Sequence, residues 1–230
     1  MNPLLLPVVA AQALWVRCTT PMVPPAAGPT MGTVGDASGP PMRIAVLGES
    51  TAAGCGADTH HDGFAGNLAR EFATRTGRTV TWQVVGQHGA TARRIRYRLL
   101  PRLGTGFDVA VLLAGVNDVL SRRTPAQWGD DLAGIVDDLA SRAGRVAVTG
   151  TPPFDAFPAL PTTLGRYLAK RADGFNDVSR RVCAGHPRAT WIDSTGTLPM
   201  GPDFFARDRF HPSSFGYGSW AKAVAATLTA

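Results

Sequence analysis

The sequence predicts an α/β protein with three layers, in which helices cover both faces of a mostly parallel sheet. From Arg43 onward, short runs rich in β-branched residues alternate with helical segments. The runs are continuously apolar rather than alternating, which is typical of parallel strands buried on both faces. Regular alternation of strand and helix implies right-handed βαβ crossovers, so the sheet is expected to lie between two helical layers.

Five strands and five helices are expected, in alternating order along the chain. The expected strands cover 43–48, 79–86 ("TVTWQVVG"), 108–114 ("DVAVLLA"), 145–150 ("RVAVTG") and 190–193 ("TWID"). The expected helices cover 62–76, 91–103, 125–142, 163–184 and 214–228. A chain of 230 residues, with 44% apolar and 17% charged residues, provides one sizeable core. We assign that core to a domain at residues 43–230.

The first 42 residues differ from the rest in composition. Residues 1–17 are expected to form an apolar helix, and residues 18–42, rich in Pro, Gly, Ser and Thr, a linker or an extended wrap over the surface. No positive residue precedes the apolar stretch, and no A-x-A site clearly follows it before Arg17. A helix docked on the body, a membrane-surface anchor and a cleaved signal remain three alternatives for residues 1–17.

Charge and cysteine usage narrow the possible partners and the compartment. The formal net charge is +6, but the arginines are scattered apart from the cluster "ARRIRYRLLPRL". This cluster predicts an amphipathic helix with a solvated basic face or, as the alternative, a site for anionic lipid or a phosphorylated substrate. No nucleic-acid partner is expected. The cysteines at 18, 55 and 183 form neither a disulfide framework nor a zinc pattern. A cytoplasmic location is therefore expected, with membrane association as the alternative.

Polar motifs follow the predicted strands at their carboxyl ends. The first three strands are followed by "GES", "GQHGAT" and "GVND", and a late loop carries "DRFHP". Ligands of open parallel sheets bind beyond the carboxyl ends of the strands. We therefore expect these four segments to converge at one edge of the sheet.

Three residues of these segments suggest nucleophilic catalysis. A serine hydroxyl such as that of Ser50 is a weak nucleophile unless a base takes its proton. His211 is the candidate base. Asp208, three residues earlier, can reach the near ring nitrogen, fix the tautomer and leave the other nitrogen for Ser50. Taken alone, the serine could be a helix cap and the histidine a structural residue. The combination favours a proton relay from Ser50 to His211 with Asp208 as its third member, called the relay below.

Acyl transfer also needs hydrogen-bond donors that stabilise the negative charge developing on the carbonyl oxygen. Three candidates are present: the backbone N–H of Ser50, the backbone N–H of Gly89 and the side-chain amide of Asn117. Gly89 suits this role because a residue without a side chain lets its N–H approach a substrate. A plain turn at Gly89 and a helix cap at Asn117 are the structural alternatives.

These segments resemble the conserved blocks of the SGNH (GDSL-type) hydrolase family. The family's first block, G-D-S, resembles the G-E-S of residues 48–50, and its second-block glycine matches G-A-T at 89–91. Its third block, G-x-N-D, stands at 115–118, and its fifth, D-x-x-H-P, at 208–212. The resemblance covers residues 43–230. It implies the SGNH hydrolase fold, a three-layer sandwich around a five-stranded, mostly parallel, flavodoxin-like sheet.

By this resemblance, Ser50 is the nucleophile, His211 the base and Asp208 the residue that orients it. The oxyanion hole would consist of Ser50, Gly89 and Asn117. The implied activity is hydrolysis of small-molecule esters with short, acetyl-type acyl groups, without a metal or organic cofactor. A thioesterase or lysophospholipase at a membrane surface, and a non-catalytic module that binds anionic surfaces, are the alternatives.

Three further points concern the surroundings of this predicted site. Asp118 resembles a structural residue that ties down the third-block loop. Glu49 replaces the family's usual aspartate, and the second block lacks the asparagine that often precedes its glycine, so the loop geometry is in question rather than the chemistry. The stiff apolar segment 151–167 is expected to line the acyl pocket, to act as a lid, or to pack over the sheet edge.

Overall fold

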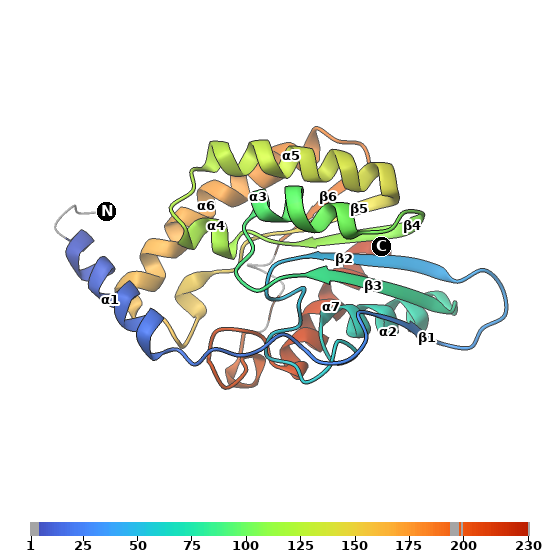
Figure 1. The fold of residues 1–230 in the computed structure, drawn as a ribbon, viewed down its shortest axis with the longest axis horizontal. Coiled ribbons are helices and arrows are strands. Elements are labelled where there is room, and N and C mark those ends of the chain that lie inside the picture. The colour runs from blue at the N-terminus through green and yellow to red at the C-terminus, as the bar shows by residue number, and fades with distance from the viewer. Residues whose placement is uncertain (1–4, 194–197, 199, 230) are drawn as a thin grey trace.

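The fold is a three-layer α/β/α sandwich around a mostly parallel sheet (Figure 1). The computed structural model describes residues 5–193, 198 and 200–229. The strand order is β1-β3-β2-β4-β5-β6. The strands are β1 (Met31–Val34), β2 (Met42–Gly48), β3 (Val80–Gly86), β4 (Phe107–Leu113), β5 (Ala143–Thr149) and β6 (Ala189–Ile192). The last five are parallel to one another, as predicted.

The sheet has six strands among the described residues, and the prediction of five was wrong by one edge strand. β1 pairs antiparallel with β3, with Met31 opposite Gln83. It lies inside the segment 18–42 that was expected to be a linker. The sequence pattern that would indicate this strand is weak, because β1 is only four residues long and its side chains are exposed or half-buried in alternation. Gly32 lets the strand lie close to Trp82, since a Cβ there would be 2.5 Å from the indole.

Helices cover both faces of the sheet (Figure 1). α2 (Phe64–Thr76) and α7 (Ser214–Thr229) pack on one face, where one of the two large hydrophobic clusters lies. α5 (Pro125–Arg142) and α6 (Thr162–Ala184) cover the other face and its cluster, together with α3 (Ala92–Arg94), the π-helical turn η2 (Ile95–Leu99) and the 3-10 turn η3 (Leu100–Arg102). The short α4 (Val116–Leu120), η4 (Phe154–Ala156) and η5 (Pro202–Phe204) lie in loops after the strands.

The N-terminal segment packs on the body of the molecule. α1 covers Leu6–Thr19, where a helix over residues 1–17 was expected, so it ends two residues later; residues 1–4 lie outside the described part of the chain. The helix docks on α6: the Leu164 N–H donates to Gln12 Oε1 at 3.0 Å, and Val9 is buried. No helix among the described residues is both long and apolar enough to cross a membrane.

The predicted linker after α1 is also part of the fold. The Ala26 N–H donates to the Ala53 carbonyl at 2.9 Å, and the side chain of Val23 packs against Ala53 and Cys55. Residues 20–30 therefore cover the loop that follows β2. Of the two alternatives for residues 18–42, a linker or an extended wrap over the surface, these contacts agree with the wrap, although the composition did not indicate which residues would be contacted.

Candidate active site

Ser50 stands in the turn directly after β2, where backbone packing holds it close to the neighbouring strand. β2 runs beside β4, and a Cβ on Gly48 would lie 2.0 Å from the Leu113 carbonyl oxygen. The Glu49 N–H donates to that same carbonyl at 2.9 Å, so the chain leaves the sheet at a defined point. The Ser50 carbonyl then accepts from the Cys55 N–H at 3.0 Å, which closes the turn. Ser50 is 7% exposed.

The loop between η5 and α7 brings His211 and Asp208 to the same turn. Gly56 permits this approach because a Cβ there would be 2.3 Å from the Pro212 carbonyl oxygen. Asp208 organises the loop itself: its Oδ1 accepts the backbone N–H groups of Phe210 and His211, each at 3.0 Å. The fold thus brings two loops that lie 161 residues apart in the sequence into contact.

The side chains of Ser50, His211 and Asp208 form a continuous hydrogen-bonded chain. His211 Nε2 lies 2.9 Å from Ser50 Oγ, and His211 Nδ1 lies 2.5 Å from Asp208 Oδ2. His211 is 8% exposed and Asp208 2%. Because a carboxylate only accepts, this network assigns the proton to Nδ1 and leaves Nε2 to take a proton from Ser50. The structure brings together the three residues that the sequence proposed as a relay.

The electrostatics of Asp208 favour its ionised form. Burial raises the pKa of this carboxyl group, but the hydrogen bonds from His211 and Phe210 outweigh burial and hold the pKa below its ordinary value. The ionised carboxylate can stabilise the imidazolium that forms when His211 accepts a proton.

Two of the three candidate oxyanion donors are available. Within the described part of the chain, neither the Ser50 N–H nor the Gly89 N–H has a hydrogen-bond acceptor. Gly89 adopts a φ of +73°, a left-handed conformation that favours glycine, and no atom lies within 4 Å of the position a Cβ would take. A substrate oxygen would therefore not compete with another acceptor from the described residues for either N–H group.

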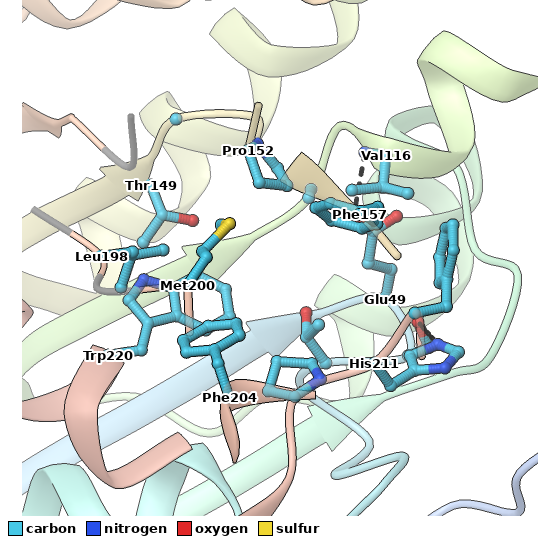
Figure 2. A pocket seen from close by; sticks show the side chains of 16 residues that line it. Glu49, Val116, Thr149, Pro152, Phe157, Leu198, Met200, Phe204, His211 and Trp220 are labelled. Atoms are coloured by element: carbon cyan, nitrogen blue, oxygen red, sulfur yellow. Dashed lines mark hydrogen bonds between the residues drawn. The ribbon is translucent and has the colours of Figure 1, made fainter. Parts of the chain in front are cut away.

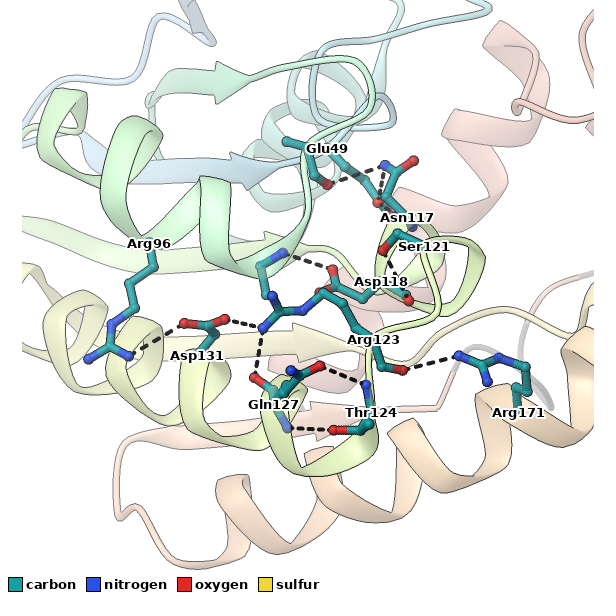
Figure 3. Close-up of polar contacts among 12 residues, drawn as sticks. Glu49, Arg96, Asn117, Asp118, Ser121, Arg123, Thr124, Gln127, Asp131 and Arg171 are labelled. Carbon is teal, nitrogen blue, oxygen red and sulfur yellow. Dashed lines mark hydrogen bonds and ion pairs between the residues drawn. The ribbon is translucent and has the colours of Figure 1, made fainter. Parts of the chain in front are cut away.

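The third candidate donor, Asn117, is already bonded. Its Nδ2 donates to Glu49 Oε2 at 2.6 Å and to the Ala90 carbonyl at 3.2 Å, so both amide hydrogens have acceptors (Figure 3). The structure thus brings Asn117 next to the predicted oxyanion hole without a free donor. Sequence reasoning placed Asn117 at this edge but had no signal for the competing carboxylate partner.

Glu49 is a buried carboxyl group in contact with the site. It is 2% exposed, and its two oxygens also accept the backbone N–H groups of Val116 and Asn117, at 3.2 Å and 3.1 Å. Burial raises the pKa of Glu49 to about 8, with Asp118 adding to this effect and the N–H donors opposing it. A residue noted in the sequence only as a departure from the family pattern is therefore an ionisable part of the site.

Asp118 ties the third-block loop to its surroundings, as the resemblance implied. Its Oδ2 accepts the Ala92 N–H at 2.8 Å, which fixes α3 to α4. Its Oδ1 lies 2.9 Å from Arg123 Nε, poorly aligned for a hydrogen bond, so this contact is an ion pair. Arg123 also pairs with Asp131 on α5 (Figure 3). Burial raises the pKa of Asp118 to about 6, although Ala92 and Arg123 oppose the rise.

An apolar cavity opens beside Ser50 and His211 (Figure 2). The cavity is narrow, because the centre of a water-sized sphere can occupy only about 40 Å³ of it. Glu49 and His211 stand at one end in Figure 2, and Thr149, Leu198 and Trp220 at the other. The remaining labelled lining residues are Val116, Pro152, Phe157, Met200 and Phe204. Pro152 and Phe157 belong to the segment 151–167, which therefore lines the cavity.

His88 is a neighbour of the relay that the sequence analysis did not assign. Its ring lies 5.9 Å from the ring of His211, measured between centroids. Burial and the nearby His211 lower the pKa of His88, with Asp208 opposing them. The only signal in the sequence was its position directly before Gly89, in "GQHGAT".

The Arg-rich segment has the exposure pattern of an amphipathic surface helix. In the Arg-rich helix, Ile95, Leu99 and Leu103 are buried, whereas Arg94 and Arg98 are exposed. Among the described residues, no group of three His, Cys, Asp or Glu side chains could hold a metal ion.

Comparison with known proteins agrees with this fold and site. The model of the GDSL-like Lipase/Acylhydrolase family matches residues 46–218, and the chain belongs to this family. The chain is 27% identical over 192 residues to the GDSL-like esterase Rv1075c of Mycobacterium tuberculosis, in an alignment that covers 76% of this chain and 58% of the relative. The chain thus spans somewhat more than half the length of this curated relative.

Solved structures of low sequence identity share the fold. TesA aligns with a TM-score of 0.65 and 22% identity, over 81% of this chain and 98% of TesA. A member of the lipolytic protein G-D-S-L family from Veillonella parvula aligns with a TM-score of 0.63 and 19% identity, over 82% and 98% of the two chains. The SGNH-hydrolase family esterase AlinE4 aligns with a TM-score of 0.59 and 22% identity, over 84% and 97%.

Proposed function

We propose that this protein is a serine ester hydrolase that cleaves short-chain, acetyl-type carboxylic esters through an acyl-enzyme. The observation that carries the proposal is the hydrogen-bonded chain from Ser50 through His211 to Asp208 at one end of an apolar cavity. Family membership and the name of the esterase relative support the same class of reaction.

The proposed reaction has two halves. Ser50 Oγ attacks the ester carbonyl carbon while His211 Nε2 takes the hydroxyl proton, and the N–H groups of Ser50 and Gly89 bind the oxyanion. The bond to the alcohol oxygen then breaks, and the imidazolium protonates the leaving alcohol. In the second half, His211 takes a proton from water, hydroxide oxygen bonds to the acyl carbon, and the bond to Ser50 breaks as the hydroxyl recovers its proton.

The size and lining of the cavity support a short acyl group. Bulky side chains narrow the space between the relay and the far end: Phe157, Met200, Phe204 and Trp220 all line it. A two- to four-carbon chain would contact these side chains, whereas a long chain would have to displace them. Each methylene that a rigid pocket gains or loses is worth about 1–3 kcal/mol in discrimination.

A chain-length series tests the proposal. We expect kcat/KM on p-nitrophenyl esters to be highest between acetyl and butyryl and at least about tenfold lower for octanoyl. Trp220→Ala should move the optimum to longer chains, because it removes the indole at the far end. Phe215→Ala is the matched control, since Phe215 lies on the same helix, is 64% exposed and does not line the cavity.

Two results would contradict this proposal. The first is the absence of both ester hydrolysis and a covalent adduct of Ser50 after incubation with a serine-directed phosphonate. The second is a chain-length profile that Trp220→Ala leaves unchanged, which would contradict the assignment of the cavity to the acyl group.

The surface of α1 favours a second proposal, contact with an anionic membrane. Val9 faces α6, but Leu14 and Trp15 are 63% and 57% exposed, and Arg17 lies in the last turn. Exposed aromatic and aliphatic side chains beside a basic residue suit insertion at the headgroup level. At such a surface, the same relay would act on thioesters or lysophospholipids.

Liposome flotation tests the membrane proposal. We expect the protein to float with vesicles that contain phosphatidylglycerol, and the double variant Leu14→Glu, Trp15→Glu to remain in the dense fraction. Met22→Glu is the control, because Met22 is 83% exposed and lies outside α1. Failure of the unmodified protein to float, or flotation of the double variant, would refute this contact.

A further inference from the structure

One side-chain amide connects the neighbours of both backbone oxyanion donors. Asn117 Nδ2 donates to Glu49, which directly precedes Ser50, and to the carbonyl of Ala90, which directly follows Gly89. We call this pair of hydrogen bonds, from Asn117 Nδ2 to Glu49 and to Ala90, the bridge. The distance between the Ser50 and Gly89 N–H groups therefore depends on the bridge. Figure 3 shows the Asn117 amide beside the carboxyl group of Glu49.

Glu49 is the fixed end of the bridge. Its Oε2 receives the two bonds from Asn117, at 2.6 Å and 3.1 Å, and its Oε1 receives only the longer bond from Val116, at 3.2 Å. The three N–H donors favour the carboxylate, but the carboxyl group is 2% exposed, and its burial outweighs them and favours the neutral form. Glu49 also lines the cavity, so it stands beside the position of the substrate.

The charges around Glu49 oppose its ionisation. Asp118 on α4 is the acidic neighbour that raises the pKa of Glu49. The other nearby titratable groups are Asp208 in the loop of the relay, the Cys55 thiol and Tyr217 on α7, whose own pKa burial and these charges raise. No Lys or Arg among the described residues forms an ion pair with Glu49. An ionised Glu49 would therefore place a negative charge, offset by N–H donors but by no cation among the described residues, next to the developing oxyanion.

We propose that Glu49 is a positioning residue for the oxyanion hole, and that it supports catalysis only while its carboxyl group is protonated. The inference rests on the ester hydrolysis proposed above. In the neutral form, Glu49 holds Asn117, and through it Ala90, without repelling the charge on the substrate. Loss of the proton strengthens the bond to Asn117, since charged acceptors bind more tightly, and adds repulsion against the oxyanion. Activity should then fall as the medium becomes alkaline.

The pH profile is the first test. The pKa of about 8 at Glu49 predicts that kcat falls about tenfold between pH 7 and pH 9 if the ionised form is inactive. Glu49→Gln cannot ionise, so its kcat should stay within about twofold over this range, and at pH 7 within about fivefold of the unmodified protein. Cys55→Ala is the control for the neighbouring thiol, whose pKa burial raises to about 11, and should keep the alkaline fall.

A double-mutant cycle tests whether Glu49 acts through Asn117. We expect Glu49→Ala to lower kcat about 10- to 100-fold with KM unchanged, and Asn117→Ala to lower it by a similar or larger factor. If the two residues act as a unit, the double variant should have the kcat of Asn117→Ala alone. Additive losses would refute this dependence.

Thermal unfolding provides a readout that needs no substrate. The pKa of Glu49 is about 8 in the folded state against an ordinary 4.5, so the folded protein binds the proton more tightly. The resulting stability is fully present below pH 4.5 and is lost as the pH rises to about 8. The Tm of the unmodified protein should therefore fall relative to that of Glu49→Gln between pH 5 and pH 9.

The two readouts separate failure of this inference from failure of the proposed function. If no ester is hydrolysed but the Tm difference follows the expected pH dependence, the proposed function fails and the buried, protonated Glu49 stands. If esters are hydrolysed and Glu49→Gln keeps the same alkaline fall in kcat as the unmodified protein, the role of Glu49 in the oxyanion hole is refuted.

Discussion

Replacing Ser50 with alanine is expected to lower kcat for ester hydrolysis by about 10⁵–10⁶-fold, a loss of the size that removal of a catalytic serine causes elsewhere. Alanine removes Ser50 Oγ, the hydroxyl that is bonded to His211 Nε2 beside the cavity, so no acyl-enzyme can form. The two backbone donors would remain, because neither belongs to the side chain. Substrate binding, measured with a non-hydrolysable amide analogue, should change little.

The measurement combines steady-state kinetics with mass spectrometry. A serine-directed phosphonate should add one equivalent to the unmodified protein and none to Ser50→Ala. Ser141→Ala is a control for the loss of a hydroxyl group, since Ser141 is exposed on α5 and its hydroxyl donates to the Asp138 carbonyl on the same helix. Residual activity above about 1% in Ser50→Ala would refute the role of Ser50 as nucleophile.

The parallel core of the fold was predictable because its signals are local. Continuous apolar runs indicated strands buried on both faces, and the five predicted strands lie within two residues of β2 to β6 at each end. The helices α2, α5, α6 and α7 were also predicted, whereas the expected helix 91–103 is divided into α3, η2 and η3, and the short α4 was not predicted. The N-terminal segment was less predictable, since its structure comes from distant contacts: β1 pairs with β3, and residues 20–30 cover the turn after Ser50.

The sequence predicted which residue types lie in the site and where they lie, but it did not predict which hydrogen-bond partners they have. The topology of a parallel sheet explains why motifs after separate strands meet at one edge, and the structure brings Ser50, His211 and Asp208 into one chain there. The partner of Asn117 was not predictable, because it depends on the length of one side chain. Glu49 has one methylene more than the family's aspartate, and its carboxyl group reaches the Asn117 amide that the sequence analysis assigned to the substrate.

Replacing Asp208 with asparagine is expected to lower kcat by about 10³–10⁴-fold while leaving the loop folded. The carboxylate has two separate tasks. Oδ1 accepts the N–H groups of Phe210 and His211, and Oδ2 accepts the proton on His211 Nδ1. An asparagine can keep its carbonyl oxygen on the two backbone donors. Its amide then faces Nδ1 with hydrogens, which favours the tautomer whose proton sits on Nε2 and cannot act as a base toward Ser50.

Asp208→Ala is the matched comparison that separates these two tasks. It removes the partner of His211 and also leaves the two backbone N–H groups without an acceptor, at a cost of about 1–3 kcal/mol for each group that stays buried. Both variants should therefore lose activity, but only the alanine variant should show a clearly lower Tm in thermal unfolding. An asparagine variant that keeps more than about a tenth of the unmodified kcat would contradict the relay. The carboxylate would then organise the loop but would not orient His211 for proton transfer.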